Sequence, residues 1–211
     1  MTNNGKIKLS KSVRISGVTY NVYSVDGFAD DSNMAGVHKG FASEIKVDYT
    51  MARQRILETF IHEIIHATDF TCFGYILEEE HVNFLAKAWL QIFIDNNLQL
   101  NNDKIKLPKK VRVGPFEYEI VFPHSFRDLP SITALSVKYS ELSIFLTDKE
   151  GDELYRMDFI KLNLFSAICL IIINTYQNEE NKVPIDFKII SGALFQVFKK
   201  NKIEELVKKY W

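Results

Sequence analysis

Residues 7–22 read IKLSKSVRISGVTYNV, and residues 105–120 read IKLPKKVRVGPFEYEI. The two stretches align without a gap, and their identical pairs are Ile7/Ile105, Lys8/Lys106, Leu9/Leu107, Lys11/Lys109, Val13/Val111, Arg14/Arg112 and Tyr20/Tyr118. A second match follows further along the chain, where LQIF at residues 90–93 corresponds to FQVF at residues 195–198. Self-similarity of this kind indicates that the chain is built from two copies of one unit.

We therefore expect two tandem units, residues 1–100 and 101–211, with extra residues in the second at a surface loop around residues 148–156. Apolar residues alternate with polar ones over residues 12–24, which is typical of strands, and Gly17 marks a turn or bulge. Strands followed by helices favour an α+β fold, each unit being a small antiparallel or mixed sheet followed by two helices. The further strands predicted are 34–40, 44–48, 132–139 and 142–147, and the predicted helices are 51–70, 79–96, 157–177 and 185–200.

The first of these helices contains the sequence LETFIHEIIHATDF at residues 57–70. Four residues turn an α-helix by about 400°, so His62 and His66 lie on one face, as two nitrogen ligands of one Zn²⁺ require. Glu63 is turned away from that face by about 100° and suits the general base of an H-E-x-x-H hydrolase. The opposite face is apolar and predicts burial at Ile56, Phe60, Ile64 and Ala67.

A catalytic zinc site needs a third protein ligand, and the second helix opens with the acidic residues Glu78, Glu79 and Glu80 followed by His81. Helical periodicity places Glu79 in line with the buried face, so we predict Glu79 as the ligand with Glu80 in reserve; His81 is a further alternative. For Glu80, a favourable interaction with the helix dipole is the simpler interpretation. The buried face predicted for this helix is Val82, Leu85, Ala86, Trp89 and Phe93.

Two more residues near the motif are candidates for supporting roles. Asp69 falls on the metal face and suits the acceptor of the second ring N–H of a ligating histidine, a usual arrangement around zinc. Cys72 lies six residues after His66, where some zinc enzymes carry a ligand, but we interpret it as a core thiol.

The bulk properties limit the classes of function. The 211 residues carry a formal net charge of −1, which gives no general attraction to nucleic acid or to an anionic membrane. The apolar run at residues 167–173 is too short to span a bilayer and predicts a buried helix. Two cysteines, no CxxC pair and no signal-like N-terminus favour a cytoplasmic protein.

The first unit resembles a known class of proteins. Residues 13–98 contain an R-I-x-G-x-x-Y-x-V start, an A-G-x-x-x-G segment with EIKVD, H-E-I-I-H-A-x-D, and E-E-x-V-x-x-L-A. In that order they resemble the small H-E-x-x-H proteins of tailed phages and prophages, which are distantly similar to the ImmA/IrrE zinc peptidase-like proteins. The resemblance implies zinc binding by His62 and His66, Glu63 as base, an acidic third ligand from the second helix, and a small residue at Gly36.

The second unit lacks the motif, because His62, Glu63 and His66 correspond to Ala167, Ile168 and Ile171. We interpret it as a degenerate copy that packs, positions substrate or binds a protein partner. Two functions stay open: a zinc metallopeptidase acting on a protein or peptide, in a host cytoplasm or a virion if phage-encoded, or a non-catalytic zincin-like binding protein with a regulatory, anti-defence or virion role.

Overall fold

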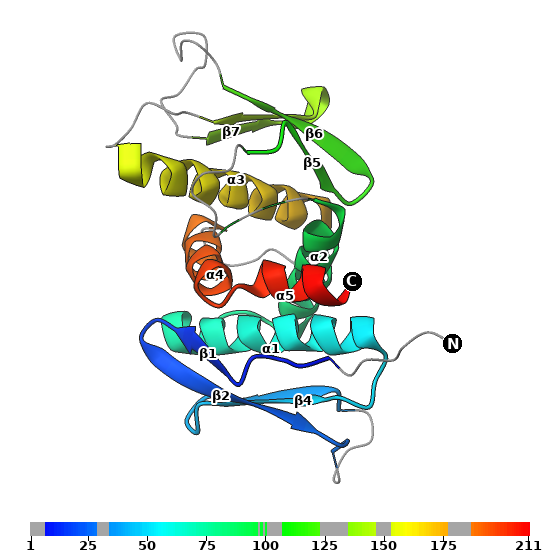
Figure 1. Ribbon diagram of the computed structural model, residues 1–211. Helices are drawn as coiled ribbons and strands as arrows, with labels where there is room; N and C mark the ends of the chain where they lie inside the picture. The colour runs from blue at the N-terminus through cyan, green and yellow to red at the C-terminus, as the bar shows by residue number, and fades with distance from the viewer. Residues whose placement is uncertain are drawn as a thin grey trace. The chain divides into compact units, whose positions relative to one another are not determined.

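The computed structural model describes residues 7–28, 34–96, 98, 100, 107–122, 135–146, 153–176 and 187–211. It has an α+β fold, with two four-stranded mixed sheets and helices that follow each sheet along the chain (Figure 1). The α+β class predicted from the sequence is therefore confirmed.

The first sheet has the strand order β1-β2-β4-β3. Strand β1 pairs antiparallel with β2, β2 pairs parallel with β4, and β4 pairs antiparallel with β3, so the sheet is mixed. Its strands and the two helices after them are β1 (Ser12–Ile15), β2 (Val18–Val25), β3 (Gly36–Lys39), β4 (Glu44–Asp48), α1 (Arg53–Phe73) and α2 (Glu79–Asp95).

The turn between β1 and β2 explains why the alternating pattern folds back on itself. Ser16 and Gly17 both have positive φ, of 44° and 91°, which is the geometry of a two-residue hairpin turn matched to the twist of the strands. Val13, Ile15 and Tyr20 then face the core and are buried. The predicted hairpin is therefore confirmed.

The second sheet repeats the first, with the order β5-β6-β8-β7 and the same sequence of antiparallel, parallel and antiparallel pairs. This agreement supports the two-copy interpretation. The elements are β5 (Lys110–Val113), β6 (Phe116–Val121), β7 (Leu135–Lys138), the short 3₁₀ helix η2 (Tyr139–Glu141), β8 (Ser143–Leu146), α3 (Glu153–Tyr176), α4 (Phe187–Lys200) and α5 (Ile203–Tyr210).

Several predicted boundaries differ from those observed. Helix α3 begins at Glu153, inside the stretch 148–156 that was expected to be a loop, and the final helix α5 was not predicted at all. Three predicted features fall partly outside the described part of the chain. They are the unit boundary at residues 101–106, the surface loop at residues 147–152 and the helix ends at residues 177–186.

The chain forms two compact units that do not follow the order of the sequence alone. Residues Met1–Leu90 and Gln196–Trp211 make up the first compact unit, and residues Gln91–Phe195 make up the second. The boundary predicted between residues 100 and 101 separates the two similar stretches of sequence, and the compact units do not test it, so it stays a prediction. In space, the C-terminal segment belongs with the first sheet.

Hydrogen bonds show how the C-terminal segment is held in the first compact unit. The side chain of Asn201 accepts from the backbone N–H of Arg14 at 2.8 Å and donates to the Arg14 carbonyl at 2.9 Å. In the second compact unit, Asn96 accepts from the N–H of Arg112 at 2.6 Å and donates to its carbonyl at 2.8 Å. Each asparagine therefore satisfies the backbone of one hairpin strand at the end of a helix.

Each long helix lies across one face of its sheet, α1 on the first and α3 on the second (Figure 1). The predicted apolar faces are confirmed, because Ile56, Phe60, Ile64 and Ala67 of α1 are all buried. The predicted buried face of α2 is buried as well. Burial of such faces is the main source of helix stability in proteins.

Helix α3 is apolar on nearly every side. Its window Asp158–Thr175 has a mean hydropathy of 1.5 and is long enough to cross a membrane by length and composition alone. However, 67% of that window is buried inside the structure, as expected for a core helix. The prediction of a buried helix at residues 167–173 therefore agrees with the structure.

Candidate metal centre

Helix α1 presents His62 and His66 side by side. Their ring centroids are 4.6 Å apart, because four residues bring the helix round by slightly more than one turn. Burial, followed by the neighbouring His66, lowers the pKa of His62 to about 4. His62 is therefore neutral at physiological pH, which is the form that ligates a metal.

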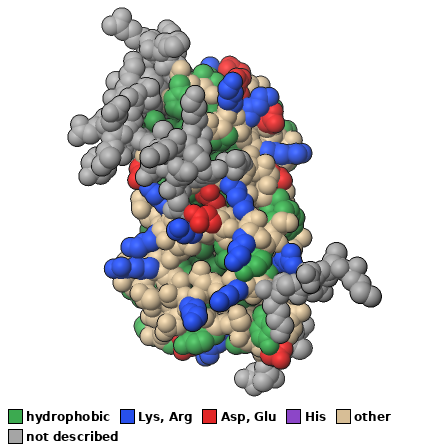
Figure 2. Space-filling view, viewed as in Figure 1, with side chains coloured by type: hydrophobic (Ala, Val, Ile, Leu, Met, Phe, Trp, Pro, Cys, Tyr) green, Lys and Arg blue, Asp and Glu red, His purple; other side chains and the backbone are tan. Residues whose placement is uncertain are grey.

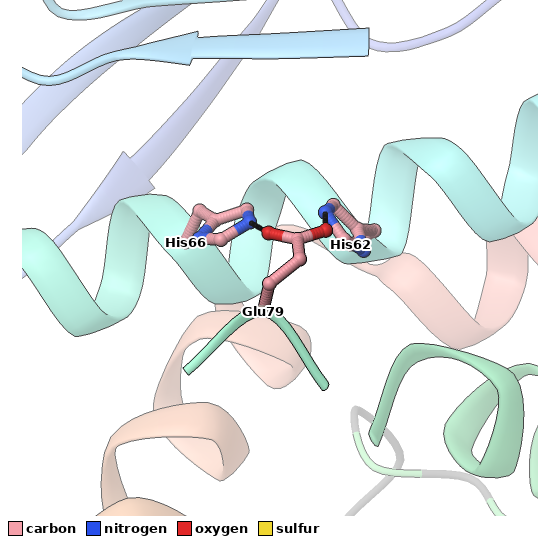
Figure 3. Close-up of side chains that lie close together, drawn as sticks. All are labelled: His62, His66 and Glu79. Carbon is pink, nitrogen blue, oxygen red and sulfur yellow. Dashed lines mark hydrogen bonds and ion pairs between the residues drawn. The ribbon is translucent and has the colours of Figure 1, made fainter. Parts of the chain in front are cut away.

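Glu79, in the first turn of α2, reaches the same place. Its Oε1 lies 3.2 Å from His62 Nε2, and its Oε2 lies 3.0 Å from His66 Nε2. Figure 3 shows the carboxylate lying between the two imidazoles, with both histidines on α1 and the glutamate at the start of α2. Asn83, one turn further along α2, donates to Glu79 Oε1 at 3.1 Å. These contacts bring Glu79 together with the two histidines, as the sequence predicted.

The three side chains suit a zinc ion. One donor atom from each lies within 4.8 Å of the other two. Tetrahedral zinc with bonds of about 2.0–2.1 Å holds its ligands about 3.4 Å apart, close to the spacings between Glu79 and the imidazoles. Two imidazoles and one carboxylate form a ligand set found in zinc hydrolases. His62, His66 and Glu79 would hold the ion, and the fourth position would be open to water or substrate.

Asp69 has a different role from the one predicted. Its side chain is 1% exposed, and its two oxygens accept hydrogen bonds from the backbone N–H groups of Ile76 at 3.1 Å and Leu77 at 3.0 Å. The expected hydrogen bond from a ligating histidine is not among the contacts of Asp69 in the described part of the chain. Asp69 instead fixes the loop that leads directly into Glu79.

The other candidates lie outside the cluster of three ligands. His81 is buried, and its Nδ1 accepts from the N–H of Glu78 at 3.3 Å, so it caps the start of α2. Glu80 is exposed on the side of α2 expected to face solvent. Cys72 is half-buried, and its Sγ lies 3.1 Å from the Ser16 hydroxyl. Among the described residues, only His62, His66 and Glu79 form a potential metal-binding group.

Glu63 is buried beneath strand β3, with 4% of its surface exposed. Burial first, and the charge of Glu79 second, raise its pKa to about 8, while a hydrogen bond from the backbone of His38 opposes the shift. A cation at the neighbouring site would favour the carboxylate and lower this pKa. The charge of Glu63 at neutral pH would therefore depend on whether a cation occupies that site.

Gly36 makes room for Glu63. A Cβ at this position would lie 2.5 Å from Thr59 Cγ2 and 2.6 Å from Glu63 Oε1, closer than side-chain atoms approach in real structures. Only glycine therefore lets β3 pass this close to α1. The glycine implied by the family resemblance has a steric reason here.

A polar cavity of about 220 Å³ joins these groups. It is lined by Met34, Ala35, Gly36, Arg55, Glu58, Thr59, His62, Glu63, Glu79 and Asn83. The proposed base and two of the three proposed ligands thus share one cavity, large enough for several waters or part of a peptide.

Sequence reasoning missed the contribution of β3. This strand is at the edge of the first sheet. The backbone N–H of Asp48 donates to the Ala35 carbonyl at 2.9 Å, so these two residues form a hydrogen-bonded pair. Hydrogen-bonded and non-hydrogen-bonded pairs alternate along an antiparallel ladder. The backbone N–H and C=O groups of Gly36 and His38 therefore point away from β4. In the described part of the chain this edge pairs with no other strand, and it lies beside Glu63.

No protein-family model, curated protein or solved structure matches this chain. The fold and the candidate metal centre therefore stand on the chain's own sequence and geometry.

The face in Figure 2 carries lysine and arginine side chains at separate places, with acidic and apolar side chains between them. Among the coloured side chains of this view, neither sign of charge forms a continuous patch.

Proposed function

We propose that the protein is a zinc-dependent peptidase whose site lies in the first compact unit. One observation carries the proposal: the cavity beside the group His62, His66 and Glu79 is lined by two of these residues, His62 and Glu79, and by the separate buried carboxyl group of Glu63. A structural zinc site has no need of the buried carboxylate.

Zn²⁺ held by His62, His66 and Glu79 would supply Lewis acidity, polarising a carbonyl group and making a water more acidic. Glu63 would take a proton from that water while the water oxygen forms a bond to the carbonyl carbon of the peptide. It would then return a proton to the leaving amine as the C–N bond breaks. The edge of β3 supports an extended peptide as substrate, because the backbone groups of Gly36 and the carbonyl of His38 can pair with another strand, while the N–H of His38 is donated to Glu63.

The test compares metal content and turnover in the full-length protein. Wild type should bind about one zinc per chain, and the His62→Ala/His66→Ala double variant should bind none. Glu63→Gln should keep the zinc and lose peptide cleavage by roughly 10²–10⁴-fold, because the general base is gone. Glu44→Gln on β4 is the matched control, and it should cleave like wild type. Equal zinc content in wild type and the double variant would end the proposal, as would equal cleavage by Glu63→Gln.

A second function is favoured by the loss of the motif in the second unit. The residues of α3 that correspond to the motif, Ala167, Ile168 and Ile171, are all buried. Their apolar side chains have no atom that could bind a metal. In this alternative the protein is a zincin-like binding protein, of phage regulatory, anti-defence or virion type, and the second unit contacts a protein partner. Zinc binding without turnover on any peptide would favour it.

We also propose that the protein works in a reducing cytoplasm, that of a host cell if it is phage-encoded. The chain has only two cysteines, and Cys169 is buried among the apolar residues of α3. Sparse cysteines are usual in proteins of a compartment that keeps thiols reduced.

A further inference from the structure

A group of aromatic side chains gathers close to the candidate metal centre. Phe41 follows β3, Phe70 is in the last turn of α1, and Tyr75 is in the loop after α1. The ring centroids of Phe41 and Phe70 are 5.4 Å apart, and those of Phe70 and Tyr75 are 4.8 Å apart. We call Phe41, Phe70 and Tyr75 the aromatic cluster.

The aromatic cluster is open to solvent. Phe41 is 99% exposed and Tyr75 is 54% exposed, while Phe70 is half-buried between them. Single exposed apolar residues are ordinary, but adjoining aromatic rings from three segments form a patch, and exposed apolar patches mark binding surfaces.

The backbone is specially shaped to hold this patch. A Cβ on Gly40 would overlap the Phe70 ring, so glycine lets the end of β3 lie against it. Tyr75 has a φ of 64°, which is rare for a bulky residue and is a form of strain that concentrates at functional sites. The glycine at position 40 and the backbone conformation of Tyr75 thus hold the three rings close together at a solvent-exposed surface.

The position of the aromatic cluster relates it to the proposed cleavage site. Phe70 is one helical turn beyond His66, and Phe41 is three residues beyond His38, whose backbone bonds Glu63. β3 ends at Lys39, so Phe41 lies in the turn just past the strand, and four residues of α1 place Phe70 about 6 Å along the helix from His66. A peptide paired with the open edge of β3 would reach the aromatic cluster two to four residues from the cleaved bond.

From this geometry we propose that the aromatic cluster is a specificity subsite that binds an aromatic or large aliphatic side chain of the peptide substrate. The proposal rests on the proposed peptidase function and adds the class of substrate: peptides with a large apolar residue two to four positions from the cleaved bond.

The test uses zinc-loaded full-length protein and a mixed peptide library whose cleaved bonds are mapped by mass spectrometry. Wild type should show enrichment of large apolar residues at one position two to four residues from the cleaved bond. Phe41→Ser and Tyr75→Asn, the latter chosen because asparagine tolerates positive φ, should lose that enrichment and still cleave. Phe41→Trp should retain it. Tyr23→Ala, which removes an exposed aromatic ring on β2, is the matched control and should behave like wild type.

Binding without cleavage gives a second measurement that does not need activity. In the Glu63→Gln background, a peptide with a central phenylalanine should bind roughly tenfold to a hundredfold more weakly after Phe41→Ser, as loss of an apolar contact of this size predicts. The same cleavage preference and the same affinity in the Phe41 and Tyr75 variants would overturn the subsite. Peptide binding that depends on Phe41, with no cleavage by wild type, would instead overturn the peptidase function and leave the subsite in place.

Discussion

Replacement of Asp69 by asparagine tests how the third proposed ligand is positioned. Among the hydrogen bonds of the described residues, Asp69 has none to either histidine, yet its two oxygens accept from the N–H groups of Ile76 and Leu77, immediately before Glu78 and Glu79. The variant keeps the size of the side chain but replaces one accepting oxygen with an NH₂ group. One backbone N–H then loses its partner in a buried place and faces another donor.

The magnitude follows from the two hydrogen bonds and their burial. A hydrogen bond to a charged group contributes about 1.5–3 kcal/mol, and an unsatisfied buried donor costs a similar amount, so Asp69→Asn should destabilise the zinc-free protein by roughly 2–4 kcal/mol. The loop carrying Glu79 should also shift. Residues that orient metal ligands typically change metal affinity by about 10–100-fold, and we expect a loss in that range.

Two assays separate the effects. Urea unfolding in the presence of a chelator gives the free energy of unfolding without metal, and competition with a chromophoric chelator gives the zinc affinity of the folded protein. Asp48→Asn is the matched control, because Asp48 also accepts from two backbone N–H groups, those of Gly27 and Thr50, but is the last residue of β4. Its zinc affinity should equal that of wild type.

A destabilised Asp69→Asn protein that binds zinc within about twofold of wild type would refute the reasoning. In that case the loop would be held for stability alone, and Glu79 would reach the histidines without help from Asp69.

Three further predictions test other parts of the structure. Gly36→Ala should destabilise the protein by roughly 1–3 kcal/mol and weaken cleavage, because its Cβ would overlap Glu63; wild-type stability in thermal unfolding would contradict this. Asn201→Ala and Asn96→Ala should each cost about 1–3 kcal/mol in urea unfolding, because each removes bonds to a strand backbone, and a cost below about 0.5 kcal/mol would count against that role. Hydrogen bonds lower the pKa of Asp48 from 3.8, so its stabilisation is complete above pH 3.8 and is lost as pH falls through the lower folded value. The urea midpoints of wild type and Asp48→Asn should therefore differ at pH 6 and converge on acidification. A difference between the midpoints that stays constant with pH would show that the ionised Asp48 side chain is not the source of the stabilisation.

Much of the fold follows from local sequence pattern. The alternation around Gly17 and its repeat after Lys109 fixed two hairpins, because side chains on a strand alternate between faces. Helical spacing identified the buried sides of α1 and α2. Helix α5 was missed although its apolar residues recur at helical spacing, at Ile203, Leu206, Val207 and Tyr210. It has only eight residues, and contacts with α1 support it in the structure.

The candidate site, too, was predicted in part from local sequence pattern. The spacing of His62 and His66 sets their common face by helix geometry alone, and the periodicity of α2 selected Glu79 over Glu80. The partner of Asp69 was mispredicted because the helix face shows which side a carboxylate occupies, and does not show which backbone N–H groups a following loop brings to it.

The sequence by itself thus determined the internal similarity, the order of the strands and of the helices α1 to α4, and the side chains that share a helix face, because these depend on contacts a few residues apart. The tertiary structure alone decided that β3 passes over Glu63 at Gly36, that Asp69 fixes the loop before Glu79, and that residues 196–211 join the first sheet. Those features depend on close approach between segments far apart in the chain, where steric fit and backbone hydrogen bonds act and local periodicity carries no information.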